Sequence, residues 1–327
     1  MELRTDVARQ YADFAAYAVD SPCFLAWAQG VVDDPEVLRW IGSLPPLKQQ
    51  PNLVFAAARW HGVPAPGPYA ALREALLGDD GGIRETILER ATQTNEVGRL
   101  ATLVPWLSRL SAEAGEPLAL VEVGASAGLC LFPDRFSYRW TTATGAVEAG
   151  AGPRLECEVD GVLPRPVGPP DVAWRAGVDL HPLDVTDEDA TAWLTTLVWP
   201  EQDSRRDRLR AAIAVARAEP PRLVAGDLLE HLPDLLEEAS AHGRVVVFHS
   251  AVVAYLETAD RDRFAALMTR WVAERRCHWV SNEAPQVLPR VTATGPEVPE
   301  GTARFVLGVD GRAVAWTHGH GASMRVL

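Results

Sequence analysis

The chain has few cysteines and no long apolar segment. Its 327 residues include four cysteines, none in a C-x-x-C pair, so the thiols fit a reduced, packed state better than disulfides or a zinc site. No stretch approaches the roughly 18 uninterrupted apolar residues that a membrane-spanning helix needs, and residues 1–10 contain no apolar signal core. We therefore expect a cytoplasmic protein without a metal site and without a membrane partner.

Positive charge is also scarce. The chain has 31 Lys and Arg residues against 44 Asp and Glu, which gives a formal net charge of −13 at pH 7. Because this charge opposes the phosphate attraction that dominates nucleic-acid binding, we expect no nucleic-acid partner. The charge favours a small-molecule or protein substrate, and we expect a small molecule. The apolar content of 47% is ample for a large core, in one domain or in a core domain with an extension.

The first third of the chain has helical periodicity. Apolar residues recur at helical spacing, and the last helical segment is one long helix or a pair joined near Pro105, which lacks a backbone donor. The helical segments lie at 3–30, 51–60, 69–77 and 83–114. Residues 1–116 contain no convincing strand, so we expect a helical N-terminal region at 1–116 and an α/β domain at 117–327.

The most informative segment is 118–129, where an apolar run typical of a buried strand ends in an acid and a series of small residues. Gly124 and Gly128 let the backbone turn sharply and approach a ligand closely. The free N–H groups of a following helix would favour an anionic group there. Glu122 stands at the entrance to the turn, where a carboxylate is a poor choice for packing. The segment therefore predicts a ligand-binding turn.

Written as E-x-G-x-S-x-G, this segment resembles the first nucleotide-binding motif of class I S-adenosylmethionine-dependent methyltransferases, with Ser126 in place of the usual middle glycine. The resemblance implies a Rossmann-like sheet with S-adenosylmethionine as cofactor. The cofactor-binding residues in this motif would be Glu122, Gly124, Ser126 and Gly128. Further along the chain, Asp227 matches the acid that commonly contacts the adenine amino group, and Leu228 would flank the ring.

The acid that holds ribose hydroxyls ends the second strand of such a site, about 20 residues after the glycine turn. The candidate here, Asp179, comes much later, which fits only if a β-hairpin is inserted at about 132–170. The alternation at 138–142 and 155–159 predicts its two strands. Alternatively, Asp179 or Asp184 caps the turn that follows.

Polar residues also end the later predicted strands. His249 and Ser250 match the fourth-motif position of the methyltransferases, beside the transferred methyl group. The ordinary pKa of a histidine near neutrality makes His249 the candidate general base. A satisfied core histidine is the alternative. Glu283 would orient that base or hold a substrate amine. Methyl transfer depends mainly on alignment of the reacting atoms, so no covalent residue is required.

An unusually polar stretch interrupts the apolar helical region just before the glycine turn. Its polar residues are Thr94, Asn95, Glu96 and Arg99. They are either a solvated turn or cap, or they close the ligand pocket, with the N-terminal helices as a lid and Glu96 in the catalytic group. Near the other end, His318 and His320 fit a flexible loop better than a metal site.

Over its whole length the sequence also resembles an uncharacterised bacterial family, DUF2332. Four segments carry this resemblance: Gln93 to Glu96, Glu122 to Gly128, Trp199 to Gln202 and Ser281 to Pro285. The family names no reaction. It does support treating the N-terminal helices as part of the same functional unit.

Two further functions compete with a small-molecule methyltransferase. The first is a protein that binds S-adenosylmethionine or a related nucleoside without transferring a group. The second is a serine hydrolase, because residues 124–128 also spell the G-x-S-x-G elbow, with Ser126, Asp227 and His249 or His318 as the triad. Topology disfavours the hydrolase, because the elbow would fall on the first strand. A nicotinamide oxidoreductase is disfavoured because G-x-G-x-x-G spacing is lacking.

Overall fold

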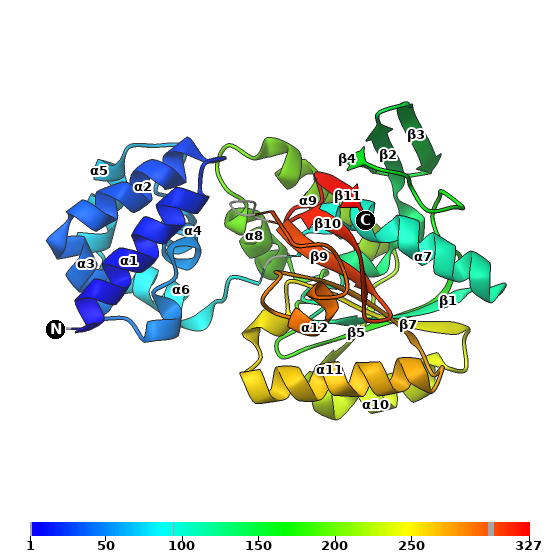
Figure 1. Cartoon of the computed structure of the whole chain (residues 1–327). Coiled ribbons are helices and arrows are strands. Elements are labelled where there is room, and N and C mark those ends of the chain that lie inside the picture. The colour runs from blue at the N-terminus through cyan, green and yellow to red at the C-terminus, as the bar shows by residue number, and fades with distance from the viewer. Residues whose placement is uncertain (1, 94, 300–303) are drawn as a thin grey trace. The chain divides into compact units, whose positions relative to one another are not determined.

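The computed structural model describes residues 2–93, 95–299 and 304–327 (Figure 1). The chain forms two compact units. One unit, here called the helical unit, comprises Met1–Thr94 and Glu188–Asp207. The other, the sheet unit, comprises Asn95–Asp187 and Arg208–Leu327. The helix before the first strand thus belongs with the sheet, and an excursion from the second half of the chain belongs with the N-terminal helices.

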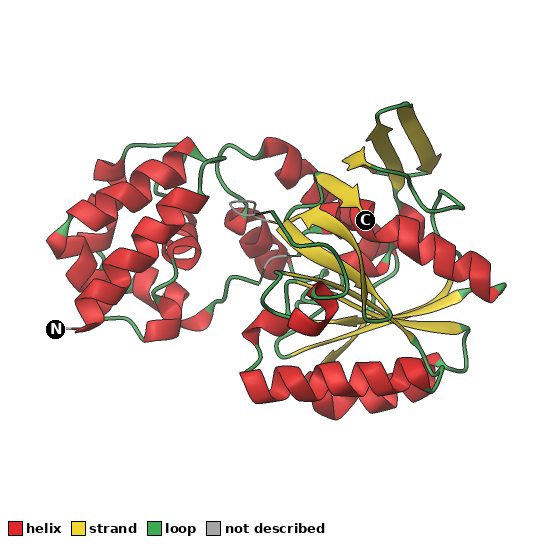
Figure 2. Cartoon of the chain, in the orientation of Figure 1, coloured by secondary structure: helices red, strands yellow, loops and turns green. Residues whose placement is uncertain are grey.

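The described part of the helical unit is built of helices, as Figure 2 shows. They are α1 (Glu2–Tyr17), α2 (Pro22–Asp33), α3 (Pro35–Gly42), η1 (Pro46–Lys48), α4 (Pro51–Trp60), α5 (Tyr69–Leu77), α6 (Gly82–Glu89) and α8 (Glu188–Leu197). Helices α2 and α3 each begin with proline after a capping residue, Ser21 and Asp34, whose side chains accept backbone N–H bonds. Aromatic packing among Phe24, Trp27 and Phe55 forms the centre of the core.

The Trp-Pro-Glu-Gln segment fastens the 188–207 excursion to the N-terminal helices. Glu201 accepts hydrogen bonds from the Ser21 hydroxyl and from the Cys23 backbone N–H at 2.8 Å. The indole of Trp199 donates to Asn52 Oδ1 at 2.9 Å. This segment of the family pattern therefore serves the fold of the helical unit.

The sheet unit contains one sheet of 11 strands in the order β3-β2-β4-β11-β10-β9-β8-β7-β1-β5-β6. The strands are β1 (Leu118–Val123), β2 (Ser137–Thr142), β3 (Gly145–Gly150), β4 (Arg154–Asp160), β5 (Val172–Asp179), β6 (Arg222–Ala225), β7 (Arg244–Ser250), β8 (His278–Glu283), β9 (Arg304–Val309), β10 (Arg312–His318) and β11 (Ser323–Val326). Strands β6, β5, β1, β7 and β8 run parallel, and β9 and β10 continue antiparallel. The α/β class expected from the sequence is confirmed.

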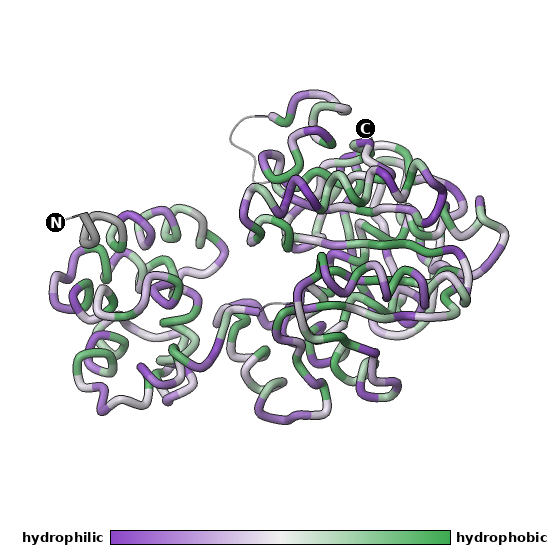
Figure 3. The backbone as a smooth tube through the Cα atoms, turned by 90° about the horizontal axis from the view of Figure 1, so that it is seen from below, coloured by the Kyte–Doolittle hydropathy of each residue, from purple (hydrophilic) through white to green (hydrophobic). Residues whose placement is uncertain are grey.

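Helices cover the central parallel strands. The helices with the sheet are α7 (Leu100–Ala114), α9 (Asp203–Ala218, which begins in the helical unit), α10 (Leu228–Ala239), α11 (Thr258–Ala273) and α12 (Pro289–Thr292). Helices α10 and α11 lie along one face of the sheet (Figure 1), where Val121, Val247 and Phe264 join one apolar core. Every residue of β1 is buried, and the central strands are largely apolar in Figure 3, as expected for a parallel sheet covered on both sides.

The inserted segment differs from the expected hairpin. The two predicted strands exist as β2 and β4, but they pair in parallel, and β3 lies on the outer side of β2 as its antiparallel partner. Gly145, Gly150 and Gly152 have φ of 127°, 82° and 106°, so the chain reverses twice and makes three strands. Because β4 also pairs with β11, the insertion extends the main sheet.

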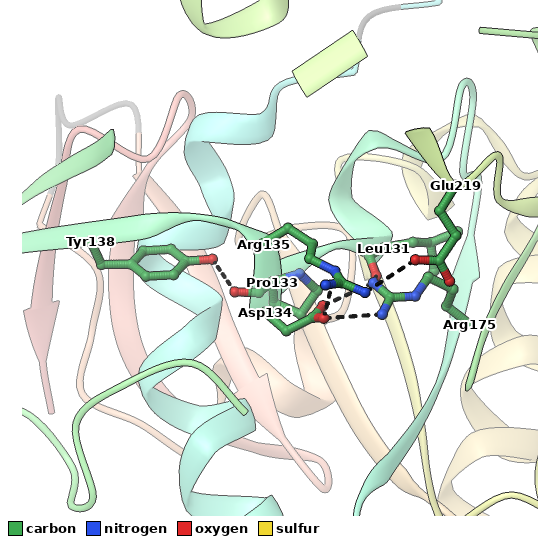
Figure 4. A network of polar contacts seen from close by, with 7 residues as sticks. All are labelled: Leu131, Pro133, Asp134, Arg135, Tyr138, Arg175 and Glu219. Carbon is green, nitrogen blue, oxygen red and sulfur yellow. Dashed lines mark hydrogen bonds and ion pairs between the residues drawn. The ribbon is translucent and has the colours of Figure 1, made fainter. Parts of the chain in front are cut away.

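Two interactions tie the insertion to the rest of the unit. Pro105 lies inside α7 and has no N–H, so the carbonyl of Ala101 is left for another donor, and the Trp140 indole of β2 donates to it at 2.7 Å. Figure 4 shows the second: Arg175 of β5 forms a two-pronged ion pair with Asp134 at 2.8 and 3.1 Å. The same guanidinium donates to the Leu131 carbonyl at 2.9 Å, which fixes the chain after the glycine turn.

None of the helices in the described ranges is long and apolar enough to cross a membrane.

Candidate functional site

The candidate site lies at the carboxyl ends of the parallel strands, beside β1. Strand β1 stands between β5 and β7, so the chain order runs outward in both directions from it. In open α/β sheets, ligands bind in the crevice beyond the strand ends at such a switch point. Glu122, near the end of β1, pairs with Gly177 of β5 and Phe248 of β7.

Strand register divides the predicted site residues between the two faces of the sheet, because successive side chains point to opposite faces. One face, here called the polar face, carries Glu122, Asp179, Ser250, Asn282 and Thr317. The opposite face, here called the packed face, carries His249, Glu283 and the apolar residues beneath α10 and α11. The sequence predicts one site that contains Glu122, His249 and Glu283. The alternation of side chains along the strands places Glu122 on one face of the sheet and the other two on the opposite face.

Glu122 is the central group of the polar face. Its side chain is buried, with 6% of the residue exposed, and Oε2 has no hydrogen-bond partner among the described residues. Burial raises its pKa well above the ordinary value, the nearby charge of Asp179 raises it further, and Arg99 opposes both. A buried oxygen without a partner is costly in a folded protein, so this one is available to a bound ligand.

The glycine turn is built as a sharp reversal. Gly124, Ser126 and Gly128 have φ of 69°, 51° and 68°. A Cβ on Gly124 would lie 2.3 Å from Cγ1 of Val252, in the loop after β7. The close approach that requires glycine at this position is therefore to the protein's own loop. Ser126 Oγ is buried and, like Glu122 Oε2, has no hydrogen-bond partner among the described residues.

The expectation of a helix after this turn is wrong. The chain continues through two short 3-10 turns, η3 (Leu129–Leu131) and η4 (Pro133–Arg135), and then enters β2. Asn95 Oδ1 accepts the Leu129 N–H at 2.6 Å. The N–H group that a helix would have offered to an anion is thus already satisfied by a side chain.

The polar segment before α7 surrounds the turn. The predicted helix at 83–114 is interrupted here: α6 ends at Glu89, and helical structure begins again at η2 (Val97–Arg99). The interruption therefore comes before Pro105, not at it. The Asn95 amide also donates to the Ala125 carbonyl at 3.3 Å and so holds both sides of the turn. Glu96 is buried and accepts the Gly98 N–H at 3.1 Å. Thr94 lies outside the described residues.

Arg99 links three segments of the sheet unit. Its Nε donates to the Gly319 carbonyl at 2.7 Å, and Nη1 donates to the Ser250 carbonyl at 2.9 Å. The guanidinium also lies over the Phe305 ring. The His318 to His320 loop is therefore packed against this arginine, and His320 N–H donates to His318 Nδ1. In the described part of the chain, no group of three or more His, Cys, Asp or Glu side chains is arranged to hold a metal ion.

The two acids after β5 have different surroundings. Asp179 is half-buried; it accepts the Ser126 N–H at 2.8 Å and the His181 N–H at 2.9 Å, so it braces the glycine turn. Asp184 is exposed and accepts the Thr186 N–H and hydroxyl, which lower its pKa. Asp179 therefore belongs to the polar face, and Asp184 caps its own turn.

His249 is fully buried in a hydrogen-bonded network on the packed face. Its Nδ1 lies 2.7 Å from Glu283 Oε1, and its Nε2 accepts the Trp279 indole N–H at 3.0 Å. Because Nε2 is an acceptor, the proton is on Nδ1 and is donated to Glu283. In this arrangement the ring has no lone pair for a substrate proton, and the geometry favours the core-histidine alternative.

Glu283 also fixes the loop that meets the glycine turn. Its Oε1 accepts the Val252 and Val253 N–H groups at 3.0 and 3.2 Å. After the edge strand β6, Asp227 accepts the Leu229 N–H at 2.7 Å and caps α10, while Leu228 packs against the core beneath that helix.

Sequence reasoning placed Ser250 at the end of a strand but missed the chain of polar residues on the polar face that leads to it. The Thr317 hydroxyl donates to Asn282 Oδ1 at 2.7 Å, and Asn282 Nδ2 donates to Ser250 Oγ at 3.0 Å. Thr317 and Asn282 are both 0% exposed. The segment Ser281 to Glu283 carried a signal in the sequence, but the sequence pointed to the charged Glu283. Only strand register shows that Asn282 faces the site.

Together, the fold and the site define an α/β protein with buried and half-buried acids at the switch point of a mostly parallel sheet. A family model described as "Uncharacterized protein conserved in bacteria (DUF2332)" matches residues 8–325, and the chain belongs to this family. Searches of the curated proteins and of the solved structures found no match.

Proposed function

We propose that the protein binds S-adenosylmethionine at the polar face and transfers its methyl group to a small molecule. The observation that carries the proposal is the pair of acids at the ends of adjacent parallel strands, Glu122 on β1 and Asp179 on β5. The order β6-β5-β1-β7-β8 supports it, because it is the 3-2-1-4-5 order of a Rossmann-like sheet when these strands are numbered along the chain.

The residues present fit such a cofactor. Glu122 Oε2 and Ser126 Oγ are buried oxygens without partners in the described chain, and both suit hydroxyl or amino groups. Asp179, already oriented by two backbone N–H groups, would hold the ribose hydroxyls. When bound, S-adenosylmethionine supplies an activated methyl group, and the protein's contribution is orientation.

The shape of the turn favours a nucleoside over a dinucleotide. A dinucleotide needs a helix N-terminus for its pyrophosphate, and the N–H of Leu129 is instead taken by Asn95. The negative charge of Asp179, which acts on Glu122, would also repel phosphate. A sulfonium nucleoside carries positive charge and no phosphate, so it suits this site better.

Non-catalytic nucleoside binding is the second candidate. It is favoured by one observation: His249 is enclosed on the packed face with both ring nitrogens hydrogen-bonded. The hydrolase alternative has no such support, because Ser126 Oγ has no hydrogen-bond partner in the described chain and the nitrogens of His249 bind Glu283 and Trp279.

Calorimetry with S-adenosylmethionine and S-adenosylhomocysteine tests the proposal. We expect binding to the wild-type protein, a loss of about tenfold or more in Asp179→Asn, and no change in the matched control Asp184→Asn. No heat or thermal shift with either nucleoside at millimolar concentration would overturn it. A screen of small-molecule extracts for products heavier by one methyl group then separates methyl transfer from binding alone.

A further inference from the structure

A buried hydrogen-bond chain ends on a half-buried serine beside the site. It runs from Thr317 on β10 through Asn282 on β8 to Ser250 at the end of β7. Its first two members are fully enclosed, whereas Ser250 is half-buried. Register places all three on the polar face with Glu122.

The direction of this chain determines what Ser250 can do. Thr317 donates to Asn282 Oδ1, so the amide NH₂ points the other way and donates to Ser250 Oγ. The serine oxygen is thereby used as an acceptor, and its own proton is left to donate. Within the described ranges, no acceptor is hydrogen-bonded to that hydroxyl. Ser250 is therefore held as a donor.

The charge beside Ser250 is positive, which suits an anionic ligand group. Arg99 Nη1 donates to the Ser250 carbonyl at 2.9 Å, and the positive charge of Arg99 acts on Glu122. The polar face therefore combines a donor hydroxyl and a guanidinium with the carboxyl groups of Glu122 and Asp179. This arrangement suits a ligand that carries an anionic group and a cationic or hydroxyl-bearing group.

We propose that Ser250 Oγ donates a hydrogen bond to the carboxylate of the amino-acid end of the bound nucleoside, with Asn282 and Thr317 as positioning residues. The inference rests on the proposed function and adds to it the recognition of the amino-acid end. Ser250 is then a binding residue, and Asn282 acts only through it.

Two nucleosides that differ in the amino-acid end test this proposal by calorimetry. S-adenosylhomocysteine has the carboxylate, and 5′-methylthioadenosine lacks it. We expect Ser250→Ala to lower the affinity for S-adenosylhomocysteine about tenfold, which is the effect of losing one hydrogen bond to a charged group. The affinity for 5′-methylthioadenosine should not change. Ser250→Thr, which keeps the hydroxyl, should restore most of the affinity. Ser240→Ala, at an exposed serine bonded to its own helix, is the matched control.

The positioning residues give a second readout. Thr317→Val removes the donor that orients the Asn282 amide. It should weaken the binding of S-adenosylhomocysteine, by less than Ser250→Ala does, and leave the binding of 5′-methylthioadenosine unchanged. Asn282→Asp places an acceptor against Ser250, so the serine proton should be donated to the aspartate. The loss of affinity for S-adenosylhomocysteine should be at least as large as that in Ser250→Ala. The serine and threonine variants suffice if the aspartate variant does not fold.

The outcomes separate this inference from the proposed function. Equal losses for both nucleosides in Ser250→Ala, or no loss for either, would overturn the inference and leave nucleoside binding intact. If the wild-type protein binds neither nucleoside, the proposed function and this inference fall together.

Discussion

Acidic side chains with little solvent contact occur in both units, and their surroundings differ. In the helical unit, Glu201 has both oxygens hydrogen-bonded, one to the Ser21 hydroxyl and one to the Cys23 N–H. In the sheet unit, Glu122 and Glu283 each keep one buried oxygen without a partner in the described chain. The Glu201 carboxylate therefore serves packing, whereas the unpaired oxygen of Glu122, on the polar face at a strand end, is suited to a ligand.

The comparison also holds within the sheet unit. Glu283 on the packed face accepts three hydrogen bonds through one oxygen. Glu122 on the polar face has a raised pKa, and its Oε2 has no hydrogen-bond partner among the described residues. Burial alone therefore does not identify a site residue. The face of the sheet and the number of donors around the carboxyl group do.

The largest expected effect is at Glu283. Glu283→Leu leaves the donors of His249, Val252 and Val253 without an acceptor, so we expect a loss of about 3–5 kcal/mol in the free energy of unfolding. Chemical denaturation measures it. Glu283→Gln keeps one accepting oxygen and should lose much less; equal losses in the two variants would show that volume, not hydrogen bonding, matters at this position.

The next effect tests the helical unit. Arg59 Nη1 donates to the Thr196 and Val198 carbonyls at 2.6 and 2.7 Å, and burial, together with the charge of Arg206, lowers its pKa to about 10. We expect Arg59→Met to lower the free energy of unfolding by about 2–3 kcal/mol, because two carbonyls lose their donor. Arg39→Met, at an exposed site, is the control. A stability equal to that of the wild type would show that these carbonyls find water instead.

Glu122→Gln sharpens the comparison through pH. Because the pKa of Glu122 is raised, the folded protein keeps a proton that the unfolded chain loses above the ordinary value of 4.5. Wild-type stability therefore falls as pH rises from that value through the raised pKa. Glutamine has no such dependence. The free energy of unfolding of the variant minus that of the wild type should become more positive as pH rises from the ordinary value of 4.5 toward the raised pKa, by about 1.4 kcal/mol for each pH unit.

A flat difference across that range would contradict the raised pKa. The matched control is Asp184→Asn, whose exposed carboxyl has a lowered pKa and lies outside the polar face. Its difference from the wild type should not become more positive as pH rises, because a lowered pKa favours the folded state above the ordinary value.

The smallest effect distinguishes a cap from a ligand contact. Asp227 accepts the Leu229 N–H and caps α10, so Asp227→Ala should cost about 1 kcal/mol and Asp227→Asn almost nothing. Calorimetry with S-adenosylhomocysteine gives the other half of the test. If Asp227→Asn weakens the nucleoside tenfold or more with unchanged stability, the adenine contact implied by the methyltransferase resemblance is restored.

Much of the architecture could be predicted from the sequence. The helical first third, the strand before the glycine turn and two of the three strands of the insertion follow from periodicity and glycine placement. The pairing of β2 with β4 could not be predicted, because alternation in each strand is the same whichever neighbour it has. The missing helix after Gly128 has a similar cause: the Arg175 and Asp134 pair that fixes this chain joins residues far apart in the sequence.

By itself, the sequence determined the α/β class, the polar residues at the strand ends and the membership of the family. Only the tertiary structure decided which of those polar residues share a face. The two-residue period of a strand determines which of its side chains share a face. The register between strands and the layer over each face come from long-range packing. For this reason Glu122 and Asn282 lie on the polar face, and His249 lies beneath the helices on the other side of the same sheet.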